Sequence, residues 1–201
     1  MTWIKTIPYA EATGKLKKLY DRVKGPNDNV DNIMMAHSLR PHTMEAHMAV
    51  YKRVLHHTAN TLDKSFLEAI GVYVSILNKC EYCVEHHYAG MARLIGDEDR
   101  AMEIRAALEI SVPKKAFDKK HSMMLKYARY LTRSPSELTE HIINKMRDLG
   151  VTDGEILEVN QVTAYFCYAN RTVLGLGIHT DGDIIGLSPG NSDDTDDWNH
   201  K

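Results

Sequence analysis

The sequence predicts an all-α fold. Apolar residues recur at spacings of three and four along most of the 201-residue chain, which is the period of an amphipathic helix. The alternation of β-branched and polar residues that marks a strand is almost absent. With 43% hydrophobic and 26% charged residues, the chain is long enough to bury one compact core. We therefore predict a single helical domain over residues 1–189.

Three helices are predicted in the first sixty residues, over 11–23, 33–38 and 42–58. The first has one apolar stripe, formed by Leu16, Leu19, Tyr20 and Val23. It ends at Gly25 and Pro26, because neither residue favours the interior of a helix. Pro41 suits the start of the third helix, where its missing N–H costs nothing. The apolar face of that helix, which we interpret as core packing, comprises Met44, Met48, Tyr51 and Leu55.

The next two helices are predicted on either side of a turn at Asn78 and Lys79. Asp63 is expected to cap the first of them, which runs to about Leu77. Asn78 with Glu81 three residues later has the pattern of a capping box, so the second would start there and end at Gly96. Four further helices are predicted over 98–109, 114–132, 135–149 and 153–174. The segment 190–201 is acidic and rich in Gly, Ser and Asn, and we predict a disordered tail without chemistry.

Composition narrows the function classes. The formal net charge of -2 and the lack of a long Lys/Arg block argue against a nucleic-acid binder. No secretory leader pattern is visible, and no apolar stretch approaches the ~20 residues that span a bilayer. We therefore expect a cytoplasmic protein that does not act at a membrane. In a reducing compartment, a close pair among only three cysteines is more often catalytic or metal-binding than structural.

The candidate site is a group of four residues within twenty positions: Glu68, Cys80, Cys83 and His87. Cys80, Cys83 and His87 stand at i, i+3 and i+7, which places them on one stripe of a helix. Cys80 would lie in the first turn, where free N–H groups and the helix dipole favour a thiolate. His87 would lie one turn below Cys83 and could act as its base.

Glu68 joins this group only if the chain reverses. On one continuous helix it would be ~18 Å from Cys80, which is twelve residues away. A turn at Asn78 instead brings Glu68 level with His87, and a carboxylate there would fix the imidazole tautomer in a Glu68–His87–Cys83 proton relay. His86 points about 100° away from His87 and shares a helix face with Tyr82. We treat His86 and Tyr82 as secondary candidates.

Other interpretations of the same residues stay open. Cys80, Cys83 and His87 are also three soft zinc ligands, with Glu68 or His86 as a fourth, although the chain has no second Cys/His cluster. A purely structural pair of buried thiols is a further alternative. Residues 62–69 resemble residues 152–159 at a spacing of 90, which indicates either an internal duplication or the common chemistry of helix starts.

The string of Glu68, eleven residues and then Cys80-Glu-Tyr-Cys-Val-Glu-His-His87 resembles the carboxymuconolactone decarboxylase and alkylhydroperoxidase D superfamily. It is most similar to the branch called peroxidase-related enzymes. Weaker similarities extend over roughly residues 5–178, including Ser38-Leu-Arg-Pro41 and Asn170-Arg171. The combination of a Glu, a Cys-x-x-Cys and a His is the specific part of the match.

This resemblance implies an alkylhydroperoxidase D-like helical fold, an antiparallel helix hairpin that carries the Cys-x-x-Cys, and homo-oligomers. It also implies an antioxidant thiol peroxidase in which Cys83 attacks a hydroperoxide and Cys80 resolves the sulfenic acid as a disulfide. Glu68 and His87 would relay protons, and a lipoylated or thioredoxin-like dithiol protein would return the electrons. No cofactor or metal is expected. One departure is Tyr82, which stands where alkylhydroperoxidase D has a histidine, so that His86 substitutes or the relay is shorter.

Three function classes therefore compete. A thiol-dependent peroxidase is the leading interpretation. A redox-responsive or zinc-stabilised Cys-x-x-Cys binding protein would use the thiols without turnover. A non-redox enzyme of the carboxymuconolactone decarboxylase type would use His87 and Glu68 for acid–base chemistry and would not need the cysteines, which members of that type typically lack.

Overall fold

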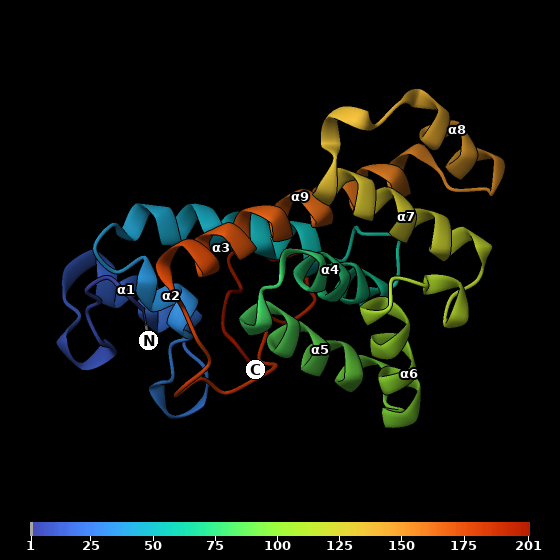
Figure 1. The fold of residues 1–201 in the computed structure, drawn as a ribbon. Helices are drawn as coiled ribbons and strands as arrows, with labels where there is room; N and C mark the ends of the chain where they lie inside the picture. The colour runs from blue at the N-terminus through green and yellow to red at the C-terminus, as the bar shows by residue number, and fades with distance from the viewer. Residues whose placement is uncertain (1) are drawn as a thin grey trace.

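The computed structural model describes residues 2–201 and shows an all-α architecture (Figure 1). Residues 2–201 contain no strand, and their one isolated β-bridge joins Pro189 to His200. The α-helices are α1 (Gly14–Val23), α2 (Asn32–Ala36), α3 (Pro41–Leu55), α4 (Lys64–Asn78), α5 (Glu81–Ile95), α6 (Glu98–Glu109), α7 (Lys119–Arg133), α8 (Glu140–Asp148) and α9 (Asp153–Leu176). The predicted fold class is confirmed.

Helix α4 forms the centre of the fold. It packs most extensively against α5 and α9, and also against α7. Of its 15 residues, 11 are buried, which explains why its sequence is apolar almost all round rather than along one stripe. Gly71 allows the close approach of α9, because a Cβ at that position would overlap the Phe166 ring. Helix α9 runs from α7 and α8 at one end to α2 and α3 at the other (Figure 1).

The turn between α4 and α5 lies where the sequence predicts it, but the capping-box prediction for Asn78 is wrong. Asn78 is the last residue of α4, Lys79 adopts a left-handed conformation at φ 59°, and Cys80 is the residue that precedes α5. The Lys79 N–H donates to the Ile76 carbonyl, and the Cys80 N–H donates to the Ser75 carbonyl at 2.9 Å. These bonds complete the end of α4 and so move the start of α5 three residues later.

The predicted boundaries elsewhere agree to different degrees. Helix α6 has the predicted bounds, and α5 ends at Gly96, which is left-handed at φ 67°. The predicted helix over 114–132 starts too early, because Pro113–Lys115 forms a separate 3-10 turn and Asp118 caps α7 by accepting from the His121 N–H at 2.8 Å. The predicted helix over 135–149 is likewise a 3-10 turn followed by α8.

The C-terminal segment differs from the predicted disordered tail. In the structure, residues 190–201 pack onto the helices, and the Trp198 side chain is buried. The Arg22 guanidinium lies 3.6 Å from the centroid of the Trp198 ring, and the Ser192 N–H donates to the His56 carbonyl at 3.2 Å. The Lys52 ammonium also donates to the Gly190 carbonyl. The buried indole and these bonds explain why an acidic segment lies against the protein. The acidic composition of the segment did not indicate these contacts.

In the part of the chain that the structure describes, no helix combines the length and the apolar character needed to cross a bilayer.

Candidate functional site

The structure brings Glu68 and His87 together, as their spacing predicts. Glu68 lies on α4 and His87 on α5, and the Glu68 Oε2 is 2.7 Å from the His87 Nδ1. The Glu68 side chain is only 2% exposed. An ionised carboxylate can only accept a hydrogen bond, so the Nδ1 carries the proton and the Nε2 is left as the basic nitrogen. The pair is thereby arranged to take a proton at a defined atom.

The two thiols lie at the start of α5 and differ in access. Cys80 is fully buried directly before the helix rather than in its first turn, whereas Cys83 lines a cavity shared with His87 and Glu68. A hydrogen bond from the Cys83 thiol lowers the pKa of Cys80, against the opposing effect of burial. Donating that bond raises the pKa of Cys83 well above its ordinary value, and burial acts in the same direction. The hydrogen bond therefore makes Cys80, rather than Cys83, the thiol that loses a proton more readily.

Asn170 ties the thiols to the centre of the fold. It is fully buried on α9, and its Nδ2 donates to the Ser75 Oγ at 3.0 Å. Its Oδ1 accepts from the Asn78 Nδ2 at 2.9 Å, so both ends of the amide contact α4. A hydrogen bond to Asn170 also acts to lower the pKa of Cys83. The amide thus fixes the position of the reactive helix start.

The cavity beside Cys83 is small. Its volume is about 40 Å³, which is room for little more than one or two water molecules. The C-terminal segment supplies part of its wall through Leu187 and His200. Other members of the lining are buried aromatic and histidine side chains from α3 and α9, namely His47, Tyr51 and Tyr165. Of the lining residues, His200 belongs to the segment 190–201, which the sequence predicts to be a disordered tail.

The secondary candidates Tyr82 and His86 belong to a neighbouring polar group. Their rings stack at 4.5 Å, which confirms the shared helix face. The Tyr82 hydroxyl donates to the Asp183 Oδ2 at 2.6 Å, and the His86 Nε2 is 3.4 Å from the same oxygen. Asp31 completes the group with His200, whose Nε2 is 3.8 Å from the Asp31 Oδ2. Tyr82 and His86 thus contact carboxylates on the C-terminal side of the cavity rather than the Glu68–His87 pair.

Asp31 makes the free energy of unfolding depend on pH. Burial raises the pKa of Asp31 from 3.8 to about 7, His86 lowers it, and the charge of Asp183 raises it further. Between these two values the folded protein binds a proton that the unfolded chain has released, so the free energy of unfolding falls as the pH rises through this interval. The loss is at most roughly 4 kcal/mol and is complete above pH 7.

Asp31→Asn should remove this dependence. We expect the variant to gain stability relative to the wild type as the pH is raised from 4 to 8, measured by urea unfolding at each pH. Asp99→Asn, at an exposed position of α6, is the matched control and should run parallel to the wild type. Parallel curves for Asp31→Asn would contradict the buried protonated carboxyl.

Sequence reasoning missed several residues of the site. His47 is buried on α3, and its Nε2 lies 3.2 Å from the Tyr165 hydroxyl. Burial lowers the pKa of His47 to about 3, so it is neutral. Its position between Met44 and Met48 on the apolar face was a usable signal, because a histidine in a core stripe needs a partner. Asp31, Asp183 and His200 are far apart in the sequence and gave no such signal.

The zinc interpretation finds no ligand set in this arrangement. Among residues 2–201, no group of three or more His, Cys, Asp or Glu side chains is placed to hold a metal ion.

Comparisons with known proteins agree with the fold. Residues 41–117, which include all four candidate residues, match the model of the Carboxymuconolactone decarboxylase family. The chain is similar to the structure of an uncharacterized peroxidase-related protein from Silicibacter sp. TM1040, with 25% identity, a TM-score of 0.76, and 89% of this chain and 91% of that chain covered. No curated protein sequence matches.

Two further structures share the fold. One is described as an alkylhydroperoxidase AhpD core, an uncharacterized peroxidase-related protein from Ralstonia eutropha JMP134, with 21% identity, a TM-score of 0.74, and coverage of 89% of this chain and 91% of that chain. The other is the debrominase Bmp8, with 15% identity, a TM-score of 0.68, and coverage of 89% and 90%. At these identities the likeness shows the fold alone.

Proposed function

The chain belongs to the carboxymuconolactone decarboxylase and alkylhydroperoxidase D superfamily, and we propose that it is a thiol-dependent peroxidase that reduces hydroperoxides. The observation that carries this proposal is the 2.7 Å hydrogen bond between Glu68 and His87 in the wall of the cavity that Cys83 also lines. A buried carboxylate that orients an imidazole in the same cavity as a thiol is an arrangement that can activate a cysteine nucleophile.

Cys83 is the attacking thiol in this proposal, because it is the cysteine in the cavity wall. The lowered pKa of Cys80 supports this role indirectly. When the pair has lost one proton, transfer of the remaining proton from Cys83 to Cys80 leaves the thiolate on Cys83, where a substrate can reach it. The hydrogen bond from Cys83 to Cys80 provides the path for that transfer.

The reaction then balances in three steps. The His87 Nε2 first takes the proton that the thiol pair loses, which leaves the Cys83 thiolate. This thiolate attacks the terminal oxygen of the hydroperoxide, so an S–O bond forms, the O–O bond breaks, and the alcohol leaves with that proton from His87. Cys80 attacks the resulting sulfenic acid, which forms the Cys80–Cys83 disulfide and releases water. A dithiol donor reduces this disulfide through a mixed disulfide, and its own thiols become oxidised.

The electron donor, the assembly and the cellular compartment are parts of the same proposal. A lipoylated or thioredoxin-like protein in the cytoplasm would supply the dithiol, and the enzyme would act there as an antioxidant homo-oligomer. Family resemblance supports these statements. Tyr82 is engaged by Asp183, so the relay in this chain would run through Glu68 and His87 alone.

A disulfide map tests the reaction class. The reduced protein is treated with one equivalent of hydrogen peroxide, and peroxide loss is followed together with peptide mass spectrometry. The proposal expects a Cys80–Cys83 disulfide to appear in step with peroxide loss, while Cys167 stays reduced. Peroxide consumption without that disulfide would contradict the proposed resolving role of Cys80. The absence of any consumption would contradict the proposed function.

The small volume of the cavity predicts a preference for small peroxides. Its 40 Å³ leaves no room for an aromatic hydroperoxide unless Leu187 moves. Leu187→Ala should therefore raise the ratio of kcat/KM for cumene hydroperoxide over hydrogen peroxide, by about tenfold, the usual scale for a few methylene groups in a pocket. Ile185→Ala, exposed on the same segment, is the control. An unchanged ratio in Leu187→Ala would show that this side chain does not limit access.

A further inference from the structure

A second cavity lies between α7 and the connection from α6 to α7. Its volume is about 570 Å³, compared with about 40 Å³ for the thiol cavity, and the two share no lining residue. This size falls within the range of small-molecule sites in proteins. The thiol chemistry proposed above makes no use of it.

The charge of this cavity is entirely positive. Its wall contains Lys114, Lys126, Arg129 and Arg133 and no acidic residue. None of these four cations makes an ion pair with any residue in the described part of the chain. This concentration of positive charge is local, because the whole chain has a formal net charge of -2. An anion bound here would be attracted by four cations that lack other partners.

The spacing along α7 directs these groups into the same cavity. Ser122, Lys126, Arg129 and Arg133 stand at i, i+4, i+7 and i+11, so successive turns present them on one face. No Asp or Glu occurs within α7 to neutralise that face. Two further hydroxyls in the wall, on Ser111 and Ser134, have no hydrogen-bond partner among residues 2–201.

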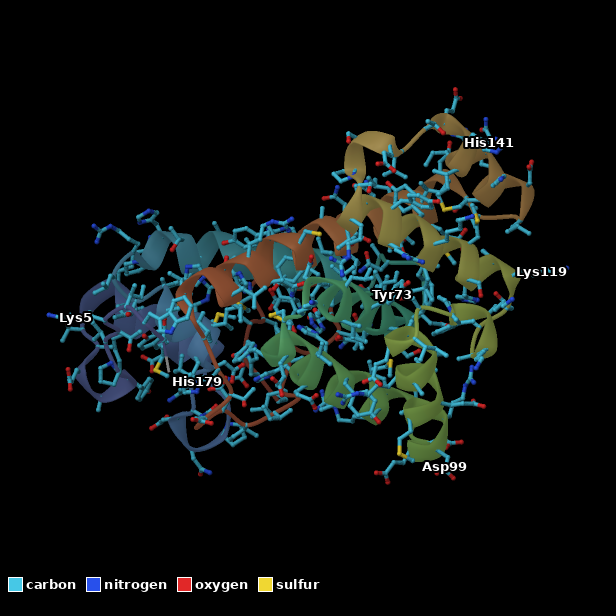
Figure 2. The ribbon with its side chains drawn as sticks, viewed as in Figure 1. Lys5, Tyr73, Asp99, Lys119, His141 and His179 are labelled. Atoms are coloured by element: carbon cyan, nitrogen blue, oxygen red, sulfur yellow. The ribbon has the colours of Figure 1, made fainter. Side chains whose placement is uncertain are left out.

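Tyr73 adds a phenol hydroxyl to the wall of the cavity. It lies on α4, in the interior beside α7 (Figure 2), and is 99% buried, with a relative exposure of 1%. Its hydroxyl makes no hydrogen bond with residues 2–201 and is not among their fully buried unpaired polar atoms, so it is open to the cavity. A ligand oxygen there could accept a hydrogen bond from it.

We propose that this cavity binds a small organic phosphate with an apolar or aromatic body. Each of the two arginines can donate two parallel hydrogen bonds to phosphate oxygens. Four cations suit a phosphate, which has more than one negative charge, better than they suit a single carboxylate. Val112, Pro113 and Tyr130 form an apolar part of the wall for the body of the ligand. The site is independent of the thiol reaction.

Calorimetric titration with 1-naphthyl phosphate at 0.15 M NaCl tests this site, since that salt screens weak attraction to exposed charges. The proposal expects saturable binding that 1-naphthol does not show and that inorganic phosphate shows more weakly. Arg129→Gln with Arg133→Gln should weaken binding at least about tenfold, because charge-assisted bonds are lost. Tyr73→Phe, which keeps the ring and so the packing, should weaken it about threefold through one neutral hydrogen bond.

The control removes the same amount of charge elsewhere. Lys18→Gln with Arg53→Gln changes two exposed positions on α1 and α3, and binding should remain as in the wild type. Several results would overturn the proposal: no saturable binding of 1-naphthyl phosphate, equal binding of 1-naphthol, or the same loss in the control as in the arginine variant. Inorganic phosphate binding as tightly as the naphthyl ester would overturn the apolar part of the site.

Discussion

Cys83→Ser will reduce peroxide turnover to the uncatalysed rate, a loss of roughly 10³-fold or more, because a serine hydroxyl is not ionised at neutral pH and attacks oxygen poorly. The side chain lines the cavity that His87 and Glu68 also line, so the substitution removes the nucleophile and leaves the base in place. The measurement is hydrogen peroxide reduction with dithiothreitol as electron donor, at matched concentrations of folded protein.

Cys80→Ser separates attack from resolution. This variant should still consume about one equivalent of peroxide per subunit, and Cys83 should then accumulate as a sulfenic acid that dimedone labels. Steady turnover should be slow because no disulfide can form within the pair. Cys167→Ser is the matched control and should keep full activity, because Cys167 does not line the cavity. Full turnover in Cys83→Ser would assign the chemistry to another group and end the proposal.

The site could be predicted from sequence where its residues are close along the chain. Glu68, Cys80, Cys83 and His87 lie within twenty residues, and helix spacing together with one turn was enough to place Glu68 beside His87. The detail of the turn was not accessible, because it depends on Lys79 adopting a left-handed conformation that the sequence does not signal. The capping box predicted at Asn78 failed for that reason.

The rest of the site depends on contacts between distant segments. Asp31 and His200 are brought together only when the C-terminal segment packs against α2 and α3. That packing depends on one indole, Trp198, within a segment whose acidic composition favours disorder. Local composition describes the average residue, whereas a single buried aromatic with a cation partner can decide where a short segment lies. The residues that form the wall of the cavity could therefore be identified only from the structure.

Glu68→Gln distinguishes a proton relay from a thiol pair that acts alone. The substitution keeps the size of the side chain in a site where Glu68 is 2% exposed, so packing is preserved. The amide can present its NH₂ to the His87 Nδ1, which would then accept rather than donate and leave the Nε2 protonated. A base in the wrong tautomer cannot take the thiol proton, and we expect kcat/KM for peroxide to fall by about 10²- to 10⁴-fold.

The control for this variant is Glu158→Gln, at the matching position of the segment 152–159 that resembles 62–69. Glu158 accepts hydrogen bonds from the Thr61 and Leu62 N–H groups at 2.8 and 2.9 Å, so it supports the approach to α4 without reaching the cavity. Its loss should lower the free energy of unfolding by about 1 kcal/mol and leave kcat/KM unchanged. Dimedone labelling then shows which step is slow. If Glu68 acts through His87, the Glu68→Gln variant forms the Cys83 sulfenic acid slowly. Its Cys80–Cys83 disulfide, once formed, is reduced by dithiothreitol at the wild-type rate. Equal activity in Glu68→Gln and the wild type would show that the Glu68–His87 hydrogen bond is structural.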